Sequence, residues 1–369
     1  MSAFGSTLAL LSSAGYRTDQ TGSQLYVSRY GVPVLDAVVG CQEKGVPLGV
    51  TARTLWMCCS KSVLLVPLCN ALRDAGADED SRVAEFIPEF AAGGKENVTL
   101  RHLLTHTVPY RSLGFTWTAE GPLDGGERSV LYAAGPQALE RLCRMPLMAE
   151  PGTLVTYTVV LNWLLLTEIL ERLTGRPHTQ SVREQVLEPL GMEHTSMYGA
   201  DPAAAAAERA LMRTLEEGRE PEVYGMETHP RASRLWPGLQ CRGPAREMVR
   251  PFECMAGWRH GRSLSACWRS KLLEPCRRGL GDPVYGGAEL QWSLGLCADP
   301  VPFGLPLSSR VVGLTGVRSS LVFADLDTGI AVAFLSTGRV PKLDDWARKR
   351  RLVRAIYADL GLRGTDLRS

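Results

Sequence analysis

The chain lacks long hydrophobic runs and carries almost no net charge. Its longest apolar stretches, residues 63–69 and 161–166, are far shorter than the roughly 20 residues that a membrane-spanning helix needs. Lysine and arginine number 41 and aspartate and glutamate number 39, which leaves a formal charge of +2. A balance so close to zero gives no electrostatic attraction for nucleic acid or for an acidic partner. We therefore expect no membrane span and no nucleic-acid partner.

Signals for export and for metal binding are lacking as well. Residues 1–11 have no basic residue ahead of their short apolar run, so they do not resemble a secretory signal. The ten cysteines are scattered without a regular framework, and we expect them to be reduced thiols of a cytoplasmic protein. His102 and His106 are separated by Leu-Leu-Thr, without the glutamate of a His-Glu-x-x-His zinc motif. We expect no metal and no cofactor, and the sequence indicates no particular oligomeric state.

What the chain does have is 45% apolar residues, with strand patterns near both ends. Residues 24–29 and 32–40 alternate as strands do, and Tyr30-Gly31 between them predicts a hairpin. Near the other end, Asp327-Thr-Gly predicts a tight turn. The pattern predicts an α/β (α+β) fold, in which one antiparallel sheet is built from both termini and flanked by helices. The strands predicted in the second half are residues 290–296, 310–314, 320–325 and 330–335.

A mostly helical region stands between the two groups of strands. We expect residues 1–75 and 286–369 to form a discontinuous sheet domain and residues 76–285 to form an inserted helical domain. The basic run Arg348-Lys-Arg-Arg is interpreted as a solvated face of the closing helix rather than a nucleic-acid patch. The predicted helices are residues 58–76 with Pro67 inside, 98–107 capped by Thr99, 137–145, 161–173 ending at Gly175, 179–188, 203–217 and 346–360.

One segment carries a nucleophile pattern. Cys58 stands three residues before Lys61 at the predicted start of a helix. Residues i and i+3 share a helix face, so both side chains would point the same way. The ammonium of Lys61 and the exposed N–H groups of a helix start both favour thiolate over thiol, and a thiolate is a nucleophile for acyl groups. A lone Cys-x-x-Lys is more often an inert buried cysteine, so the surrounding motifs decide whether Cys58 is interpreted as a nucleophile.

Those surroundings resemble the serine β-lactamase and penicillin-binding-protein superfamily, and most of all its class C β-lactamase-like esterase and acyltransferase branch. In this likeness Cys58 takes the place of the nucleophilic serine of Ser-x-x-Lys, Lys61 that of its lysine, and Tyr157 that of the tyrosine in Tyr-x-Asn. The resemblance implies a β-lactamase/transpeptidase-like fold and chemistry on acyl groups. It covers roughly residues 24–334 and is carried by residues 54–62, 98–107, 151–159, 190–195 and 313–317.

The departures from the family pattern bear on the substrate. The family's Asn position holds Val159, and the Lys or His of its third motif is Leu314. The groups that bind a substrate carboxylate in β-lactamases are therefore missing, and we expect no β-lactam hydrolysis. By analogy, the backbone N–H groups of Cys58 and Val317 would form the oxyanion hole. The candidate substrate-binding residues are Trp292, Thr315 and Gly316.

These residues predict acyl transfer through a Cys58 thioester, with Lys61 and Tyr157 managing the proton. The expected partner is a small-molecule or carrier-protein-bound acyl substrate, such as a carrier-protein or coenzyme A thioester. We expect a biosynthetic acyltransferase or a cyclising acyl-transfer enzyme. Two alternatives stay open, namely a cysteine esterase or amidase, and a non-catalytic β-lactamase-like protein that only binds.

Other residues near these motifs are weaker candidates. Cys59 is expected to pack against the sheet, because no lysine lies three residues after it. His106 and Glu168 are interpreted as structural. Asn162 is a weak replacement for the missing Asn, since it sits one helical turn further along. The remaining candidates are Ser60 as a nucleophile and Trp236 as a pocket wall.

Overall fold

The computed structural model describes residues 4–110, 117–118, 121–122, 136–158, 160–197, 210–224, 236–261, 264–305 and 308–362. Val159 and residues 203–209 of the predicted 203–217 helix lie outside these ranges. No helix within the described ranges is both long and apolar enough to cross a bilayer.

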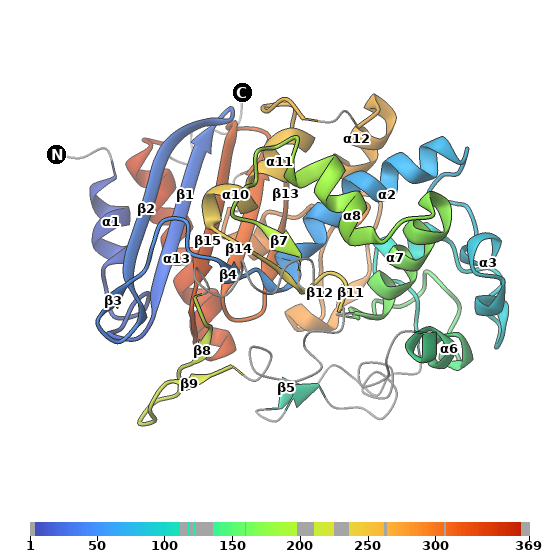
Figure 1. The fold of residues 1–369 in the computed structure, drawn as a ribbon, viewed down its shortest axis with the longest axis horizontal. Helices are drawn as coiled ribbons and strands as arrows, with labels where there is room; N and C mark the ends of the chain where they lie inside the picture. Colours follow the sequence, from blue (N-terminus) through green and yellow to red (C-terminus); the bar gives the residue numbers. More distant parts are fainter. Residues whose placement is uncertain are drawn as a thin grey trace.

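The centre of the fold is a six-stranded antiparallel sheet drawn from both ends of the chain. In sheet order its strands are β13 (Val311–Gly316), β14 (Ser320–Asp325), β15 (Ile330–Ser336), β1 (Gly22–Arg29), β2 (Val32–Glu43) and β3 (Val46–Pro47). β1 and β15 lie side by side, as the blue and red strands of Figure 1 show, with Leu25 opposite Phe334. The predicted fold class, the hairpin at Tyr30-Gly31 and the turn before β15 are confirmed.

Helices cover both faces of this sheet (Figure 1). On one face lie two helices from the ends of the chain, α1 (Gly5–Leu11) and α13 (Lys342–Asp359), which contact each other. On the other lie η1 (Met57–Lys61), α2 (Ser62–Asp74), α10 (Ala245–Met248) and α11 (Arg250–Met255). β14 and β15 are buried along their whole length, which is why they read as nearly continuous apolar runs.

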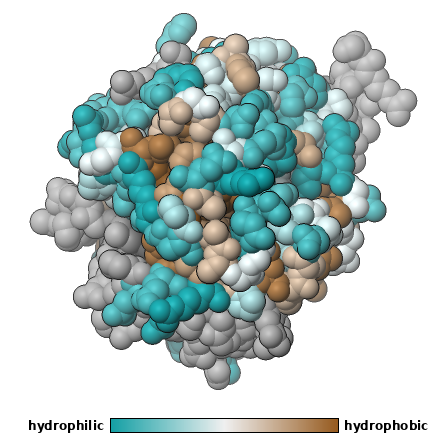
Figure 2. All heavy atoms as spheres, turned by 90° about the vertical axis from the view of Figure 1, so that its right-hand side faces the viewer, coloured by the Kyte–Doolittle hydropathy of each residue, from teal (hydrophilic) through white to brown (hydrophobic). Residues whose placement is uncertain are grey.

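The helical part of the molecule packs around α7 (Leu161–Thr174), which ends at Gly175 as predicted. α7 contacts α2, and it also contacts α3 (Val83–Phe86), α4 (Leu100–Leu104), α6 (Pro136–Arg144) and α8 (His178–Val182). The face at this end of the molecule is mainly hydrophilic, with apolar side chains showing between the polar ones near its centre (Figure 2). The other helical turns are η2 (Pro88–Ala91), η3 (Arg183–Leu187), α12 (Ala266–Leu273), η4 (Pro283–Tyr285) and η5 (Val301–Phe303).

Short strands outside the main sheet join distant segments. β10 (Cys241–Gly243) pairs with β4 (Thr54–Leu55) and with β7 (Ser196–Met197), so it ties the stretch just before Cys58 to the middle of the chain. The remaining pairs are β8 (Arg213–Thr214) with β9 (Glu222–Val223) and β16 (Gly338–Arg339), β11 (Gly281–Asp282) with β12 (Ala288–Glu289), and β5 (Trp117–Thr118) with β6 (Gly121–Pro122).

Two predictions of secondary structure are wrong. Residues 290–296 form a buried turn instead of a strand, because Gly295 has a φ of 87° and the Ser293 N–H donates to the Leu296 carbonyl at 2.9 Å. Their alternating apolar side chains are all buried around that turn. The described part of the predicted 203–217 helix, residues 210–217, holds β8, because the Arg213 N–H donates to the Thr337 carbonyl at 2.7 Å.

The basic run on α13 was expected to be solvated, and this is also wrong for its first two members. Arg348 and Lys349 are 2% and 3% exposed, and both form ion pairs with the buried Asp345. Three residues at i, i+3 and i+4 share one face of the helix, and here that face is turned toward the sheet. The prediction of a solvated face rested on charge alone. The backbone carbonyls that accept hydrogen bonds from these two cations belong to distant segments, so the local sequence does not reveal them.

Candidate active site

Cys58 lies in a 3₁₀ turn, η1, between strand β4 and helix α2. The predicted helix therefore begins later than expected, at Ser62. The preceding Trp56 is fully buried, and its amide and indole N–H groups donate to the Cys241 and Gly243 carbonyls, both at 2.9 Å. These bonds fix the Cys58 segment to β10, so the candidate nucleophile stands on a rigid support.

The two residues after Cys58 point into the packed interior. The Cys59 thiol lies 3.5 Å from the Leu314 carbonyl and 3.4 Å from the Ser320 hydroxyl, as expected for packing against the sheet. Burial raises the pKa of the Cys59 thiol to about 12, so it stays protonated at neutral pH. The Ser60 hydroxyl accepts a hydrogen bond from the Cys241 N–H at 3.0 Å. Ser60 is thereby a structural residue, and Cys58 is the one of the three that lines a cavity.

Lys61 is fully buried behind the tyrosine that the sequence paired with it. Its ammonium donates to the Gly238 carbonyl at 3.3 Å and lies 5.8 Å from the Tyr157 ring centroid and 5.9 Å from that of Trp163. A Cβ on Gly238 would lie 3.0 Å from the Lys61 side chain, so glycine is required for this approach. The positive charge of Lys61 is thus held beside the phenol of Tyr157.

Tyr157 is positioned by a stack of aromatic rings. Its ring centroid lies 4.3 Å from that of His106 and 5.9 Å from that of Trp292. His106 and Trp292 meet edge to face at 5.2 Å, and the Arg277 guanidinium lies 5.1 Å from the Trp292 ring. Arg277 is in turn fixed by an ion pair with the buried Asp282 at 3.0 Å. The stack leaves the Tyr157 ring little freedom to turn away from Cys58.

Backbone hydrogen bonds connect two of the family-like segments, residues 98–107 and 151–159. The Thr156 N–H donates to the His106 carbonyl at 2.9 Å, and the Gly152 N–H donates to the Thr107 carbonyl at 2.8 Å. Residues 98–107 therefore hold the segment that carries Tyr157. Asn162 also binds the segment 98–107, since its side-chain amide donates to the Leu103 carbonyl at 2.8 Å. It is thus a structural residue, as is Glu168, which pairs with Arg172 on the surface at 2.7 Å.

The protonation states of the stack follow from burial and from nearby charge. Burial, the negative charge of a Cys58 thiolate and a hydrogen bond with Cys58 raise the pKa of Tyr157 well above its usual value. Burial and the positive charges of Lys61 and Arg277 hold the pKa of His106 well below its usual value. At neutral pH Tyr157 is therefore a proton donor next to the sulfur, and His106 is an uncharged support for its ring.

The end of strand β13 lies against the Cys58 turn. A Cβ on Gly316 would lie 2.8 Å from the Trp56 carbonyl oxygen and 3.0 Å from Met57 Cβ, so no side chain fits there. The Ser320 hydroxyl donates to the same Trp56 carbonyl at 2.7 Å. Val317, the next residue, packs with Tyr157 in the small apolar cluster around Cys58. Glycine at position 316 thus brings the two expected oxyanion-hole residues to the same place.

Replacing Gly316 by alanine is expected to push β13 away from the Cys58 turn. The Cβ would lie only 1.9 Å from the Ser320 hydroxyl oxygen, besides its contact with the Trp56 carbonyl, and overpacking of this kind costs about 1–3 kcal/mol. We expect a lower urea midpoint and slower acylation of Cys58, measured by stopped-flow release of p-nitrophenol from an activated ester. Gly49→Ala is the matched control, because its Cβ would meet nothing closer than 3.8 Å. An unchanged midpoint and rate in Gly316→Ala would contradict the close approach.

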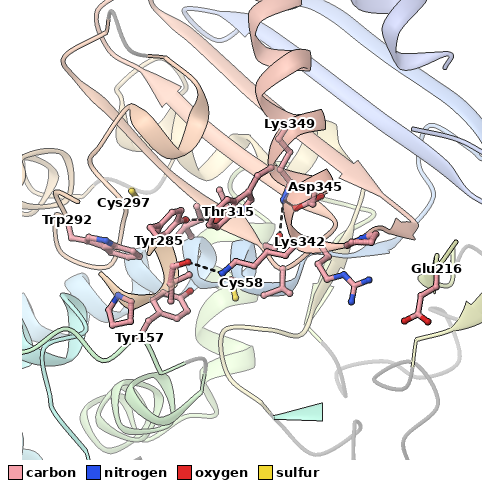
Figure 3. A pocket seen from close by; sticks show the side chains of 18 of the residues that line it. Cys58, Tyr157, Glu216, Tyr285, Trp292, Cys297, Thr315, Lys342, Asp345 and Lys349 are labelled. Atoms are coloured by element: carbon pink, nitrogen blue, oxygen red, sulfur yellow. Dashed lines mark hydrogen bonds and ion pairs between the residues drawn. The ribbon is translucent and has the colours of Figure 1, made fainter. Parts of the chain in front are cut away.

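These residues form the floor and one wall of a cavity of about 770 Å³ (Figure 3). Cys58 lines the cavity, and it is 1% exposed. A stacked pair of rings, Tyr285 and Trp346, also lines the cavity; their centroids are 5.4 Å apart and their planes differ by 6°. The Tyr285 hydroxyl lies 3.0 Å from that of Thr315. Charged groups also line the cavity: Glu216, Glu217, Arg318, Lys342, Asp345 and Lys349.

Nearly all of the candidate site residues that the sequence predicts line the cavity or lie next to it. Lys61 lies behind it, beside Tyr157, and Trp236 packs on the Cys58 cluster. Sequence reasoning missed Tyr285 and the α13 residues, because no motif marks them; the only signal was an aromatic and a lysine four positions apart at the start of the last helix. The candidate site residues that line the cavity are Cys58, Tyr157, Trp292, Thr315, Gly316 and Val317.

Within the described ranges, no three His, Cys, Asp or Glu side chains are grouped as metal ligands would be. In and beside the cavity, the structure brings together the thiol of Cys58, the phenol of Tyr157 and the ammonium group of Lys61. This set is suited to attack on an acyl carbonyl. Val160, Leu239 and Val317 pack around Cys58 and make its surroundings apolar.

Comparison with known proteins gives consistent results over nearly the whole chain. The family model described as Beta-lactamase matches residues 11–355. Esterase EstB of Burkholderia gladioli is 27% identical over 350 residues, which cover 85% of either chain. A penicillin-binding protein homologue from Caulobacter crescentus aligns with a TM-score of 0.78 at 22% identity, over 97% of this chain and 98% of that one. EstCE1, a hydrolase with promiscuous acyltransferase activity, aligns at 0.77 with 20% identity, over 96% and 98%.

Proposed function

Since this chain belongs to the Beta-lactamase family, whose model matches it from residue 11 to residue 355, we propose that it is an acyltransferase that works through a thioester on Cys58. The similar proteins include an esterase and a hydrolase with promiscuous acyltransferase activity. The observation that carries the proposal is the placement of the Cys58 sulfur next to the Tyr157 hydroxyl on the floor of a deep cavity. Burying these two polar groups in apolar surroundings costs folding free energy, so we expect them to have a function there.

In the first half-reaction, the Cys58 thiolate attacks the carbonyl carbon of an acyl donor. The negative charge that forms on the carbonyl oxygen is stabilised by the backbone N–H groups of Cys58 and Val317. As the carbon–sulfur bond to the enzyme forms, the bond to the leaving group breaks. Tyr157 gives its proton to the departing thiolate or alkoxide, and the Lys61 ammonium stabilises the resulting phenolate.

In the second half-reaction, an acceptor amine or alcohol attacks the thioester. Burial keeps the pKa of Tyr157 raised after the thiolate has gone, so its phenolate is a strong base and takes the proton of the acceptor. The carbon–sulfur bond then breaks, the acylated acceptor leaves, and Cys58 returns to the thiolate with Tyr157 protonated. Each half-reaction conserves protons and electrons, so no redox partner is needed.

The acyl donor is proposed to be a thioester, on coenzyme A, on a carrier protein or on a small thiol. A cysteine exchanges readily with another thioester because the attacking and leaving atoms are both sulfur. Leu314 and the Tyr285–Trp346 pair make one part of the cavity wall apolar, which disfavours water as acceptor there and suits a hydrophobic acyl chain. A biosynthetic role, by transfer or by cyclisation, follows from this preference for a bound acceptor.

A cysteine esterase or amidase is the second candidate, favoured by the likeness to EstB over 85% of either chain. The two activities share the first half-reaction and differ only in which nucleophile releases the acyl group. They are therefore separated by the fate of the thioester and not by its formation.

The test is to incubate the protein with short-chain acyl thioesters of N-acetylcysteamine and with p-nitrophenyl esters, and to measure the intact mass. We expect an acyl adduct that peptide mapping places on Cys58. The adduct should decay at least about tenfold faster with an added amine or alcohol than in buffer, a difference of about 1.4 kcal/mol in barrier. Equal decay rates across a panel of acceptors would favour the hydrolase. Donor binding without any adduct would leave a protein that only binds.

A further inference from the structure

Two cations of helix α13 hold the turn that follows strand β13. The Lys349 ammonium donates to the Gly316 carbonyl at 3.0 Å, and the Arg348 guanidinium donates to the Arg318 carbonyl at 3.0 Å. These carbonyls belong to the residues on either side of Val317. The carbonyl of Val317 itself accepts from the Ser319 hydroxyl at 3.3 Å. Every carbonyl of the turn from residue 316 to residue 318 therefore has a fixed partner.

The cations are themselves anchored. Asp345 pairs with both Arg348 and Lys349, and all three side chains are between 2% and 4% exposed. Arg348 also donates to the carbonyl of Gly338, in the short strand β16, at 3.1 Å. In such a buried place the interaction of an ammonium with a carbonyl dipole is weakly screened. The group is thus a rigid, positively charged support under the turn, and Asp345 and Lys349 reach the cavity.

The bond to Gly316 bears directly on Val317, because the two share one peptide unit. In a trans peptide the carbonyl and the N–H point to opposite sides of the chain. The Gly316 carbonyl points to Lys349, so the Val317 N–H points away from it, on the other side of the peptide. A hydrogen bond at the oxygen of an amide also polarises the amide and strengthens its N–H as a donor.

We propose that Lys349 is a positioning residue for the oxyanion hole, which orients and polarises the Gly316–Val317 peptide so that the Val317 N–H stabilises the oxyanion. The inference rests on the proposed function and adds to it a charged residue from the last helix of the chain. Lys349 touches neither the acyl group nor the sulfur in this role. It acts only through the peptide that it holds, and its effect grows as charge develops on the acyl oxygen.

The test compares two reactions of the same sulfur in Lys349→Met and in the wild type. Acylation by a p-nitrophenyl ester builds an oxyanion and needs the Val317 N–H, whereas alkylation by iodoacetamide displaces iodide and forms no oxyanion. We expect Lys349→Met to slow acylation about 10- to 100-fold, somewhat less than complete loss of an oxyanion donor. Alkylation of Cys58, followed by mass spectrometry, should keep its wild-type rate, and the dissociation constant of the ester should change little.

A second variant covers the case in which Lys349→Met fails to fold. Asp345→Asn/Lys349→Met removes one buried charge of each sign, so it leaves the net charge of the cluster unchanged. Lys95→Met is the matched control, because Lys95 is another fully buried lysine, whose ammonium donates to the Cys143 and Met145 carbonyls at 2.8 Å, outside the residues that line the cavity. It should lower stability without changing the ratio of the two rates.

The outcomes separate this inference from the function on which it rests. Slower acylation with unchanged alkylation in either Lys349 variant supports it. Acylation at the wild-type rate in a folded Lys349 variant overturns it and leaves the proposed function standing. An equal fall of both rates also overturns it, since that is general damage to the site. A wild-type protein that is alkylated at Cys58 but never acylated overturns the proposed function, and this inference with it.

Discussion

Replacing Cys58 by alanine is expected to remove the acyl adduct and to slow turnover of activated esters by about 10⁴- to 10⁶-fold, as loss of a covalent nucleophile does in other acyl-transfer enzymes. No neighbour can take over the role. The Cys59 thiol is held by the Leu314 carbonyl and the Ser320 hydroxyl, and burial raises its pKa to about 12. The measurement is intact-protein mass spectrometry together with p-nitrophenol release over a single turnover.

Two variants make this result specific. Cys59→Ala removes the adjacent buried thiol and should keep the adduct and the rate within about threefold, at some loss of stability from the small cavity. Cys58→Ser restores the residue type of the family-like motif and should abolish iodoacetamide labelling at position 58, because a hydroxyl does not alkylate under these conditions; peptide mapping separates this site from the exposed Cys267 and Cys276. An adduct that persists in Cys58→Ala, or one that disappears in Cys59→Ala, would move the nucleophile away from Cys58.

The parts of the fold that local sequence determines could be predicted. The strands that became β1, β2, β14 and β15 were found because alternation and turn residues are signals within a few positions of each other. The helix that became α7 was found for the same reason, with Gly175 as its end. The sequence also brought Cys58, Lys61 and Tyr157 into one hypothesis, although it gave no distance between them.

What could not be predicted depends on contacts between distant segments. The alternating apolar residues of 290–296 lie in a buried turn. They were predicted as a strand because burial on all sides of a turn gives the same apolar pattern as a strand. Arg348 and Lys349 were taken for a solvated face because charged residues are seldom fully buried unless they are paired. Their partners, Asp345 and the carbonyls of the turn at Val317, become visible only when α13 is packed on the sheet. Tyr285 and Trp346, which line the cavity, could not be predicted for the same reason.

Tyr157→Phe is expected to slow acylation of Cys58 by about 10²- to 10⁴-fold, the usual contribution of a positioned proton donor. Phenylalanine keeps the ring that stacks on His106 and Trp292, so only the hydroxyl is lost. Burial and the thiolate of Cys58 raise the pKa of Tyr157, so the phenol carries its proton across the neutral range. It is therefore available to donate to the leaving group, and its own ionisation should cause no fall in rate between about pH 6 and pH 9, below its ordinary value near 10.

The leaving group gives the sharpest test of that role. A p-nitrophenolate needs no proton to depart, whereas an alkyl thiolate or alkoxide does, so the loss in Tyr157→Phe should grow as the pKa of the leaving group rises. The measurement is the acylation rate constant for a series of aryl and alkyl esters of one acid, plotted against leaving-group pKa for both proteins. Alkylation by iodoacetamide should fall by a smaller factor, about 10-fold, because a hydrogen bond to a charged sulfur is lost. A loss that is equal for all leaving groups would mean that Tyr157 only stabilises the thiolate, and that the proton comes from another group, such as the Lys61 ammonium beside the ring.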